Sequence, residues 1–409
     1  MKLFNLKKYG CDLGVDRVSL SRALFYVGYI IWLIWKLISI SMFSFAEGSA
    51  VNTILHGFSL LLLLCSSVML WKFDSKTVLA LAFCVFGLVV KINSGSVVFI
   101  DLAFLFYASR CTQFDDIARL SLALLGIGSV AIVFSSVIGV IPDYLFARGE
   151  TIRHGLGFLY STNLSHLYLN IVLLYLFLKR DDLSHAECLL LFSVDILIFI
   201  LTDSRNSCGL VAIALCCAVV FKWVRSNAFE FVLALIARWS FIFFTVLLIV
   251  AALAYNPTDE GWRKLNGFTS NRIAQDHASL IKYGVRPFGQ EIEFANHTIA
   301  MGETDRTEQQ EKPTGDPNIV ESSFLNILIT KGYVSLLLVL TAFLIAMRNE
   351  CDRWLSIIML MIAAHSAFDF QLINLLYTTF LIWVWNRTSY IFSSSKLGQC
   401  LDHHLASAR

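Results

Sequence analysis

Long apolar runs alternate with short polar segments along almost the whole chain. Most runs cover roughly 17–25 residues, the length that an α-helix needs to cross a bilayer. The pattern predicts about twelve membrane spans, of which the fourth and the last two are short. Their approximate bounds are 21–45, 51–71, 77–93, 96–110, 118–141, 160–178, 186–203, 206–223, 236–255, 322–347, 354–371 and 372–388. The expected fold class is an all-α, polytopic integral membrane protein.

One long polar stretch, residues 256–321, separates the ninth span from the tenth. It divides the chain into nine spans with short loops (1–255), one large loop (256–321), and three spans with a tail (322–409). Within the loop, Arg272, Ile273, Leu280 and Ile281 have the spacing of a short amphipathic helix.

Composition narrows the class of protein. The chain is 57% hydrophobic and 15% charged, proportions that a soluble globular protein of 409 residues would hardly have. None of the ten cysteines lies in the large loop, so that neither a disulfide framework nor a metal site is expected. No phosphate-binding glycine loop is present either. We expect no cofactor, no nucleotide and no nucleic-acid partner.

Basic residues indicate the orientation. With the N-terminus inside, every cytoplasmic segment carries at least two lysine or arginine residues, the charge bias of inner loops. This predicts that both termini are cytoplasmic and that residues 256–321 lie outside. Outer loops usually avoid clustered basic charge. Arginines that remain there are therefore candidates for binding an anion.

Two outer segments combine an arginine with other polar residues. Arg153 precedes two glycines and Asn163, and a guanidinium beside accessible backbone suits a phosphate group. The alternative is an interfacial arginine that contacts lipid headgroups. Asp203 and Arg205 form a tight turn between the seventh and eighth spans, and each could reach a different partner. The alternative is a polar turn that caps the eighth helix.

The large loop and the spans after it supply the remaining candidates. Arg272 and Arg286 could bind the anion, or belong to a solvated charged face. Glu321 lies where the loop re-enters the membrane, and could act as a base or only complement a helix dipole. His365 and Asp369 are four residues apart on one helix face, where they could be functional or only hold helices together.

Two further carboxylates, Asp101 and Asp195, fall within predicted spans. Lys91 is the expected structural partner of Asp101, so that this pair is not expected to be catalytic.

Taken in order, these motifs resemble the Wzy-type polymerases of bacterial capsule, exopolysaccharide and O-antigen assembly, a family related to the O-antigen ligases. The likeness covers most of the chain from about residue 150 onward. It lies in five motifs. They are an Arg-Gly stretch ending in Asn (153–163), a Thr-Asp-Ser-Arg turn (202–205), an Asn…Ser-Arg-Ile run with a later Phe-Gly (266–273 and 288–289), an acidic-Ser-aromatic sequence where the loop re-enters the membrane (321–324), and a His-Ser…acidic pattern (365–369). Some members have an Arg-x10-Gly spacing, from which Gly284 departs by one residue relative to Arg272.

The resemblance implies a GT-C-like fold in the bacterial cytoplasmic membrane. It also implies transfer of a glycan from undecaprenyl diphosphate to another lipid-linked repeat unit at the outer face, without metal. Arg153, Arg205 and Arg272 would then bind the diphosphate, helped by Asn163 and Arg286. Glu321 is the first candidate for the base, followed by Asp203, His365 and Asp369. The implied partners are lipid-linked oligosaccharides, membrane lipids, a flippase and a chain-length regulator.

Three other classes remain open. A flippase or transporter would also have about twelve spans, but none of the five prolines breaks a predicted span. An O-antigen ligase is closer in chemistry, although His297 lacks the Gly-x-x-Pro that typically follows such a histidine. A scaffold without activity would give no reason for outward arginines.

Overall fold

The computed structural model describes residues 15–43, 50–148, 151–224, 226–292 and 320–395. Within these ranges the protein is mostly helical, and seven helices are long and apolar enough to cross a membrane. They are α1 (Val15–Ser39), α2 (Ala50–Met69), α3 (Ser75–Ser94), α5 (Phe114–Val137), α7 (His185–Thr202), α8 (Arg205–Trp223) and α9 (Asn227–Ala254). These helices agree with the all-α, polytopic membrane protein expected from the sequence.

Shorter helices correspond to the other predicted spans. They are α4 (Val98–Ala108), α6 (Asn163–Lys179), α14 (Tyr333–Ala346), α15 (Arg353–Phe368) and α16 (Leu381–Ser394). The interior of the bundle holds α6 and α15, and most side chains of both helices are buried. The lipid-facing helices instead expose large apolar side chains, which suits contact with acyl chains.

The predicted tenth span is interrupted. It begins as α13 (Ser323–Asn326), continues as the π-helical segment η4 (Ile327–Lys331), and breaks at Gly332 before α14. The broken backbone is bound by residues 287–290 of the large loop. The amide of Gln290 donates to the carbonyl of Thr330 (3.1 Å), and its side-chain amide donates to that of Ile329 (3.2 Å).

Two glycines allow this close contact, which we call the glycine clasp (residues 287–290 against 330–332). A Cβ atom on Gly289 would lie 2.2 Å from the carbonyl oxygen of Thr330, and one on Gly332 would lie 2.3 Å from that of Pro287. Both glycines also have positive φ angles, of 85° and 92°. Only glycine is compatible with both constraints.

The predicted last span was placed wrongly. The sequence suggested 372–388, but residues 369–380 are irregular and α16 covers Leu381–Ser394. Side chains bind the irregular backbone: Ser323 accepts from the amide of Leu372 (3.0 Å), and Asn170 donates to the carbonyl of Leu376 (2.9 Å). Irregular backbone at membrane depth is tolerated where protein surrounds it.

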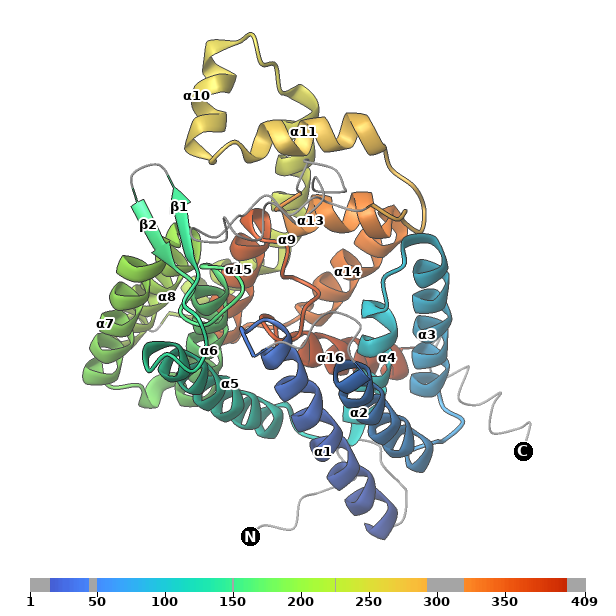
Figure 1. The fold of residues 1–409 in the computed structure, drawn as a ribbon. Helices are drawn as coiled ribbons and strands as arrows, with labels where there is room; N and C mark the ends of the chain where they lie inside the picture. The colour runs from blue at the N-terminus through green and yellow to red at the C-terminus, as the bar shows by residue number, and fades with distance from the viewer. Residues whose placement is uncertain (1–14, 44–49, 149–150, 225, 293–319, 396–409) are drawn as a thin grey trace.

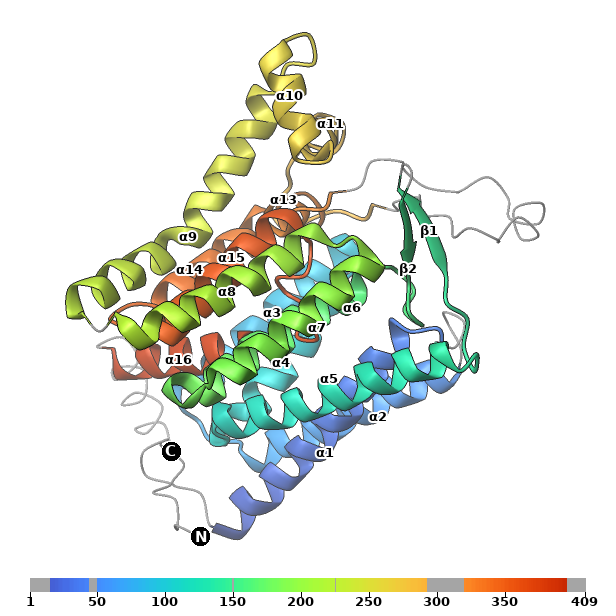
Figure 2. The ribbon, with the colours of Figure 1, turned by 90° about the vertical axis from the view of Figure 1, so that its left-hand side faces the viewer.

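The large loop contains α10 (Glu260–Phe268) and α11 (Arg272–Tyr283), which stand on the continuation of α9 (Figures 1 and 2). A hairpin of β1 (Leu145–Arg148) and β2 (Thr151–His154) lies at the same end of the bundle (Figure 1). The sequence analysis did not anticipate this hairpin. We refer to this side as the loop end.

Ion pairs join connections at the opposite end. Arg180 lies 2.8 Å from Asp352, and Arg353 lies 2.5 Å from Asp181. These pairs link the α6–α7 connection to the α14–α15 connection, which fixes the spacing of the central helices.

One expectation about a partner was wrong. Asp101 is bound by His56 rather than by Lys91, because α2 places the imidazole nitrogen 3.1 Å from both carboxylate oxygens. Seven cysteines among the described residues are free thiols.

Candidate functional site

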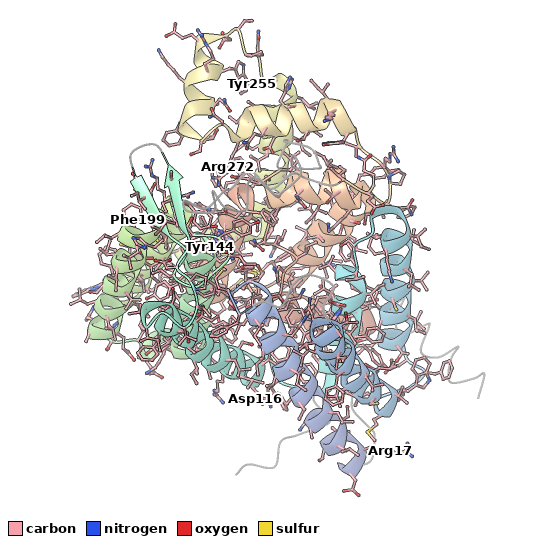
Figure 3. All side chains as sticks on the ribbon, in the orientation of Figure 1. Arg17, Asp116, Tyr144, Phe199, Tyr255 and Arg272 are labelled. Atoms are coloured by element: carbon pink, nitrogen blue, oxygen red, sulfur yellow. The ribbon has the colours of Figure 1, made fainter. Side chains whose placement is uncertain are left out.

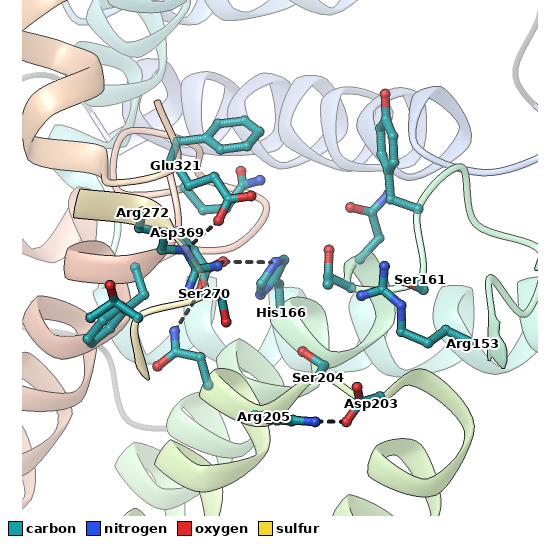
Figure 4. A pocket seen from close by; sticks show the side chains of 18 of the residues that line it. Arg153, Ser161, His166, Asp203, Ser204, Arg205, Ser270, Arg272, Glu321 and Asp369 are labelled. Carbon is teal, nitrogen blue, oxygen red and sulfur yellow. Dashed lines mark hydrogen bonds and ion pairs between the residues drawn. The ribbon is translucent and has the colours of Figure 1, made fainter. Parts of the chain in front are cut away.

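A cavity of about 750 Å³ opens at the loop end of the bundle (Figure 4). Five separate segments and strand β2 contribute to its wall: the start of α6, the α7–α8 turn, the α10–α11 turn, the re-entry of the loop and the end of α15. The lining residues that concern the site are Arg153, Asn163, His166, Asp203, Arg205, Asn206, Phe268, Arg272, Glu321, Asp369 and Phe370.

Three arginines from segments far apart in the sequence therefore share one cavity. Arg153 comes from β2, Arg205 from the first residue of α8 and Arg272 from the first residue of α11. Arg286 lies outside the cavity wall, because it is exposed beyond α11 and next to the glycine clasp. The fold thus separates Arg286 from the other three arginine candidates.

Arg272 is held at the mouth of the membrane bundle by the α10–α11 turn (Figure 3). Ser270 and Asn271 adopt positive φ angles of 56° and 67°, which reverse the chain between the helices. Asn266 fixes the turn, because its side chain donates to that of Asn271 (3.1 Å) and accepts from the amide of Ala274 (2.9 Å). Hydrogen bonds local to the loop therefore fix the conformation of the turn that carries Arg272.

The guanidinium of Arg272 contacts two carboxylates. Its Nε donates to Glu321, and its Nη2 lies 3.8 Å from Asp369. The side chain of Glu321 is 36% exposed, and that of Asp369 is 13% exposed. Glu321 is thus the more accessible of the two.

Asp203 and Arg205 form a second pair on the cavity wall. Asp203 caps α7 with a left-handed φ of 46°, and its Oδ1 lies 3.2 Å from the Nε of Arg205. The guanidinium side chain is 70% exposed, so that this pair is open to solvent and can exchange partners at little cost. The sequence analysis had left two possibilities open, separate partners for these residues or a polar turn that caps α8, and had not foreseen that they pair with each other.

Asp369 lies at the centre of a buried polar network. Asn206 donates to its Oδ2 (2.5 Å), and His365 lies 3.4 Å from the same oxygen. His166 lies 3.6 Å from Oδ1 and 3.0 Å from His365. His365 does not line the cavity, but it supports Asp369 and His166, which do.

His166 was missed by the sequence analysis. It lies one helical turn after Asn163, at the start of a predicted span, and an ionisable residue within a span is by itself a sign of a functional site.

Asn163 lines the cavity and connects α6 to two distant segments. Its side chain accepts from the hydroxyl of Tyr377 (3.2 Å) and donates to the carbonyl of Ile40 (3.4 Å).

Three residues of this network could hold a metal ion. Ligand atoms of His166, His365 and Asp369 lie within 4.8 Å of one another. Two imidazoles and a carboxylate form a donor set that suits zinc or iron. The sequence spacing gave no sign of this set, because His166 is far from the other two.

The pKa of Asp276, on α11 outside the membrane spans, is raised from 3.8 to about 7. Burial is the main cause; the nearby charge of Glu321 adds to the shift and Arg272 opposes it. An opening of α11 that hydrates Asp276 therefore releases a proton between about pH 4 and pH 7. The closed state should lose stability as the pH rises through that window, by about tenfold in the opening equilibrium per pH unit.

Hydrogen exchange of the α11 amides should reveal this dependence. In the Asp276→Asn variant, the opening equilibrium of α11 should no longer depend on pH. Dividing the exchange rate of the wild type by that of the variant at each pH cancels the intrinsic pH dependence of hydrogen exchange. An equal slope in both proteins would contradict the assignment to Asp276.

No family model matches the sequence, and neither a curated protein nor a solved structure matches it significantly. The function is therefore argued from the chemistry of the cavity.

Proposed function

We propose that the protein is a polysaccharide polymerase similar to the Wzy type, acting at the outer face of the bacterial cytoplasmic membrane. It would transfer a growing glycan from undecaprenyl diphosphate to another lipid-linked repeat unit. One observation carries the proposal: three arginines and three carboxylates from five segments of the chain line one cavity. A diphosphate leaving group requires cations that stabilise its charge, and a hydroxyl nucleophile requires a carboxylate that can accept its proton.

The diphosphate would bind to Arg153, Arg205 and Arg272. Negative charge develops on the phosphate oxygen as the glycosidic bond breaks, and a guanidinium stabilises it with paired hydrogen bonds. Such fixed donors are most effective when they are positioned before the reaction. The turn that holds Arg272 meets this requirement.

Glu321 is the proposed base. In the structure it is paired with Arg272, and an arriving diphosphate would compete for the same guanidinium. Exchange of partners would release the carboxylate beside the acceptor, where it could take the proton of the attacking hydroxyl. Binding of the donor would thus activate the base.

Asp369, His166 and His365 would orient the site. Asp369 lies 3.8 Å from Arg272, and Asn206 and His365 hold it in place. Asp203 would position Arg205 in the same way.

A ligase would need the same diphosphate site, and differs in the acceptor that it uses. A flippase gains some support from the helix break at Gly332, because transporters bind substrates at broken helices. However, residues 287–290 cover this break, and Gly332 does not line the cavity. The polymerase therefore remains the better reading.

Purified protein should elongate lipid-linked repeat units without nucleotide and in the presence of EDTA. The reaction draws its free energy from the bond between the donor sugar and the phosphate, which breaks to release undecaprenyl diphosphate, and the arginines supply the positive charge. Product length can be followed on gels.

Three outcomes would contradict this account. Loss of activity in EDTA, with rescue by zinc, would show that the two histidines and Asp369 act as a metal centre. Transfer to a lipid A core but not to a second repeat unit would indicate a ligase. Movement of the intact lipid-linked repeat unit across the membrane of a vesicle, without ATP and without elongation, would indicate a transporter.

A further inference from the structure

Three phenylalanines line the cavity, and two of them, Phe268 and Phe370, are exposed. The third, Phe368, is partly buried, and its ring centre lies 5.7 Å from the guanidinium of Arg272. Phe268, the last residue of α10, is 89% exposed, and Phe370, next to Asp369, is 52% exposed. Exposed phenylalanines on the lipid-facing helices are accounted for by the bilayer. Phe268 belongs to the large loop instead, so that its exposure has no such explanation.

The residues that follow the two phenylalanines in the sequence are polar. Thr269 and Ser270 follow Phe268, Gln371 follows Phe370, and all three line the same cavity. Ligand sites commonly combine apolar ring faces with a few polar groups that fix orientation. A sugar fits this combination, because its ring has an apolar C–H face and its edge carries hydroxyl groups.

The rings also lie close in sequence to the reacting groups. Phe268 is four residues before Arg272, and Phe370 follows Asp369 directly. A sugar placed against them would therefore lie beside the arginine and the carboxylates. We infer that Phe268 and Phe370 form a subsite for the sugar rings of the acceptor, which rests on the proposed function above.

The alternative for an exposed aromatic ring is contact with the polyprenyl chain. The polyprenyl chain must remain in the bilayer, whereas Phe268 sits on a helix of the loop. The polar neighbours also favour a ligand with hydroxyl groups over a hydrocarbon. We therefore propose that the two rings contact the sugar, and the experiment below tests contact with the polyprenyl chain as the alternative.

Two probes separate these readings in nanodiscs: undecaprenyl diphosphate without sugar, and the free oligosaccharide released by mild acid from the host's own lipid-linked repeat unit. Phe268→Ala should weaken binding of the oligosaccharide by about tenfold, and Phe268→Ala with Phe370→Ala should weaken it further. Neither variant should change binding of undecaprenyl diphosphate. Phe268→Trp should retain the affinity and report binding through its fluorescence.

Phe243→Ala is the matched control, because Phe243 is 60% exposed on α9 within a membrane span. It should bind both probes like the wild type. Unchanged binding of the oligosaccharide by the double variant would overturn the subsite. Weakened binding of undecaprenyl diphosphate by the double variant would overturn it in favour of a lipid contact.

The proposed function can fail separately. If the wild type elongates repeat units and the double variant does so with the same acceptor dependence, only the subsite is wrong. If the wild type neither elongates them nor binds either probe, both proposals are wrong.

Discussion

Replacing Arg272 by alanine should abolish long polymer while single-repeat products persist. Arg272 contacts both Glu321 and Asp369, so that its loss removes a diphosphate donor and leaves two carboxylates facing each other. Loss of one positioned donor in such a site costs on the order of 3 kcal/mol in the barrier, or about a hundredfold in rate. Gel analysis of lipid-linked products would measure the effect.

Two arginine variants make this result specific. Arg286→Ala is the matched control, since Arg286 is in the same loop but outside the cavity, and it should polymerise normally. Arg205→Ala should behave like Arg272→Ala, because Arg205 also faces the cavity. If Arg205→Ala and Arg272→Ala both made a full-length ladder, at normal protein levels, the arginine assignment would be wrong.

Glu321→Gln should lower kcat by about 10²- to 10⁴-fold, the usual contribution of a general base. KM for the lipid-linked donor should stay the same or fall, because the amide no longer competes with the diphosphate for Arg272. Single-turnover elongation over a range of donor concentrations separates the two effects.

Asp369→Asn provides the contrast. If Asp369 only orients Arg272 and the histidines, its variant should raise the donor KM as well as lower kcat. A Glu321→Gln enzyme with near-normal kcat, beside an Asp369→Asn enzyme without turnover, would transfer the role of base to Asp369.

The sequence located the seven long apolar helices well, because the bilayer imposes a length on each membrane-spanning helix. Span 206–223, for example, corresponds to α8 at Arg205–Trp223. The prediction was wrong where residues 369–380 are buried by neighbouring helices. Their apolar residues resemble a span, but Ser323 and Asn170 bind the irregular backbone from distant parts of the chain. Local hydrophobicity cannot reveal such partners.

The site shows the same division. Arg153, Arg205 and Arg272 were recognisable because basic charge is unusual in the loops that the charge pattern assigns to the outer side, and the fold brings all three to one cavity. The pairing of Arg272 with Glu321 depends on contact between residues 49 positions apart. His166 approaches Asp369 across an even longer separation. Such pairs form because the fold brings distant segments together, and a single sequence does not show which segments will be neighbours.

The glycine clasp has a practical consequence. It anchors the chain just after α11, while Ser323 and the end of α15 anchor it again where it re-enters the bundle. Arg272 and Glu321 thus each owe their location to a separate attachment. An epitope tag inserted between residues 292 and 320 should leave activity intact, and its accessibility to antibody in whole spheroplasts would report directly which way the molecule faces.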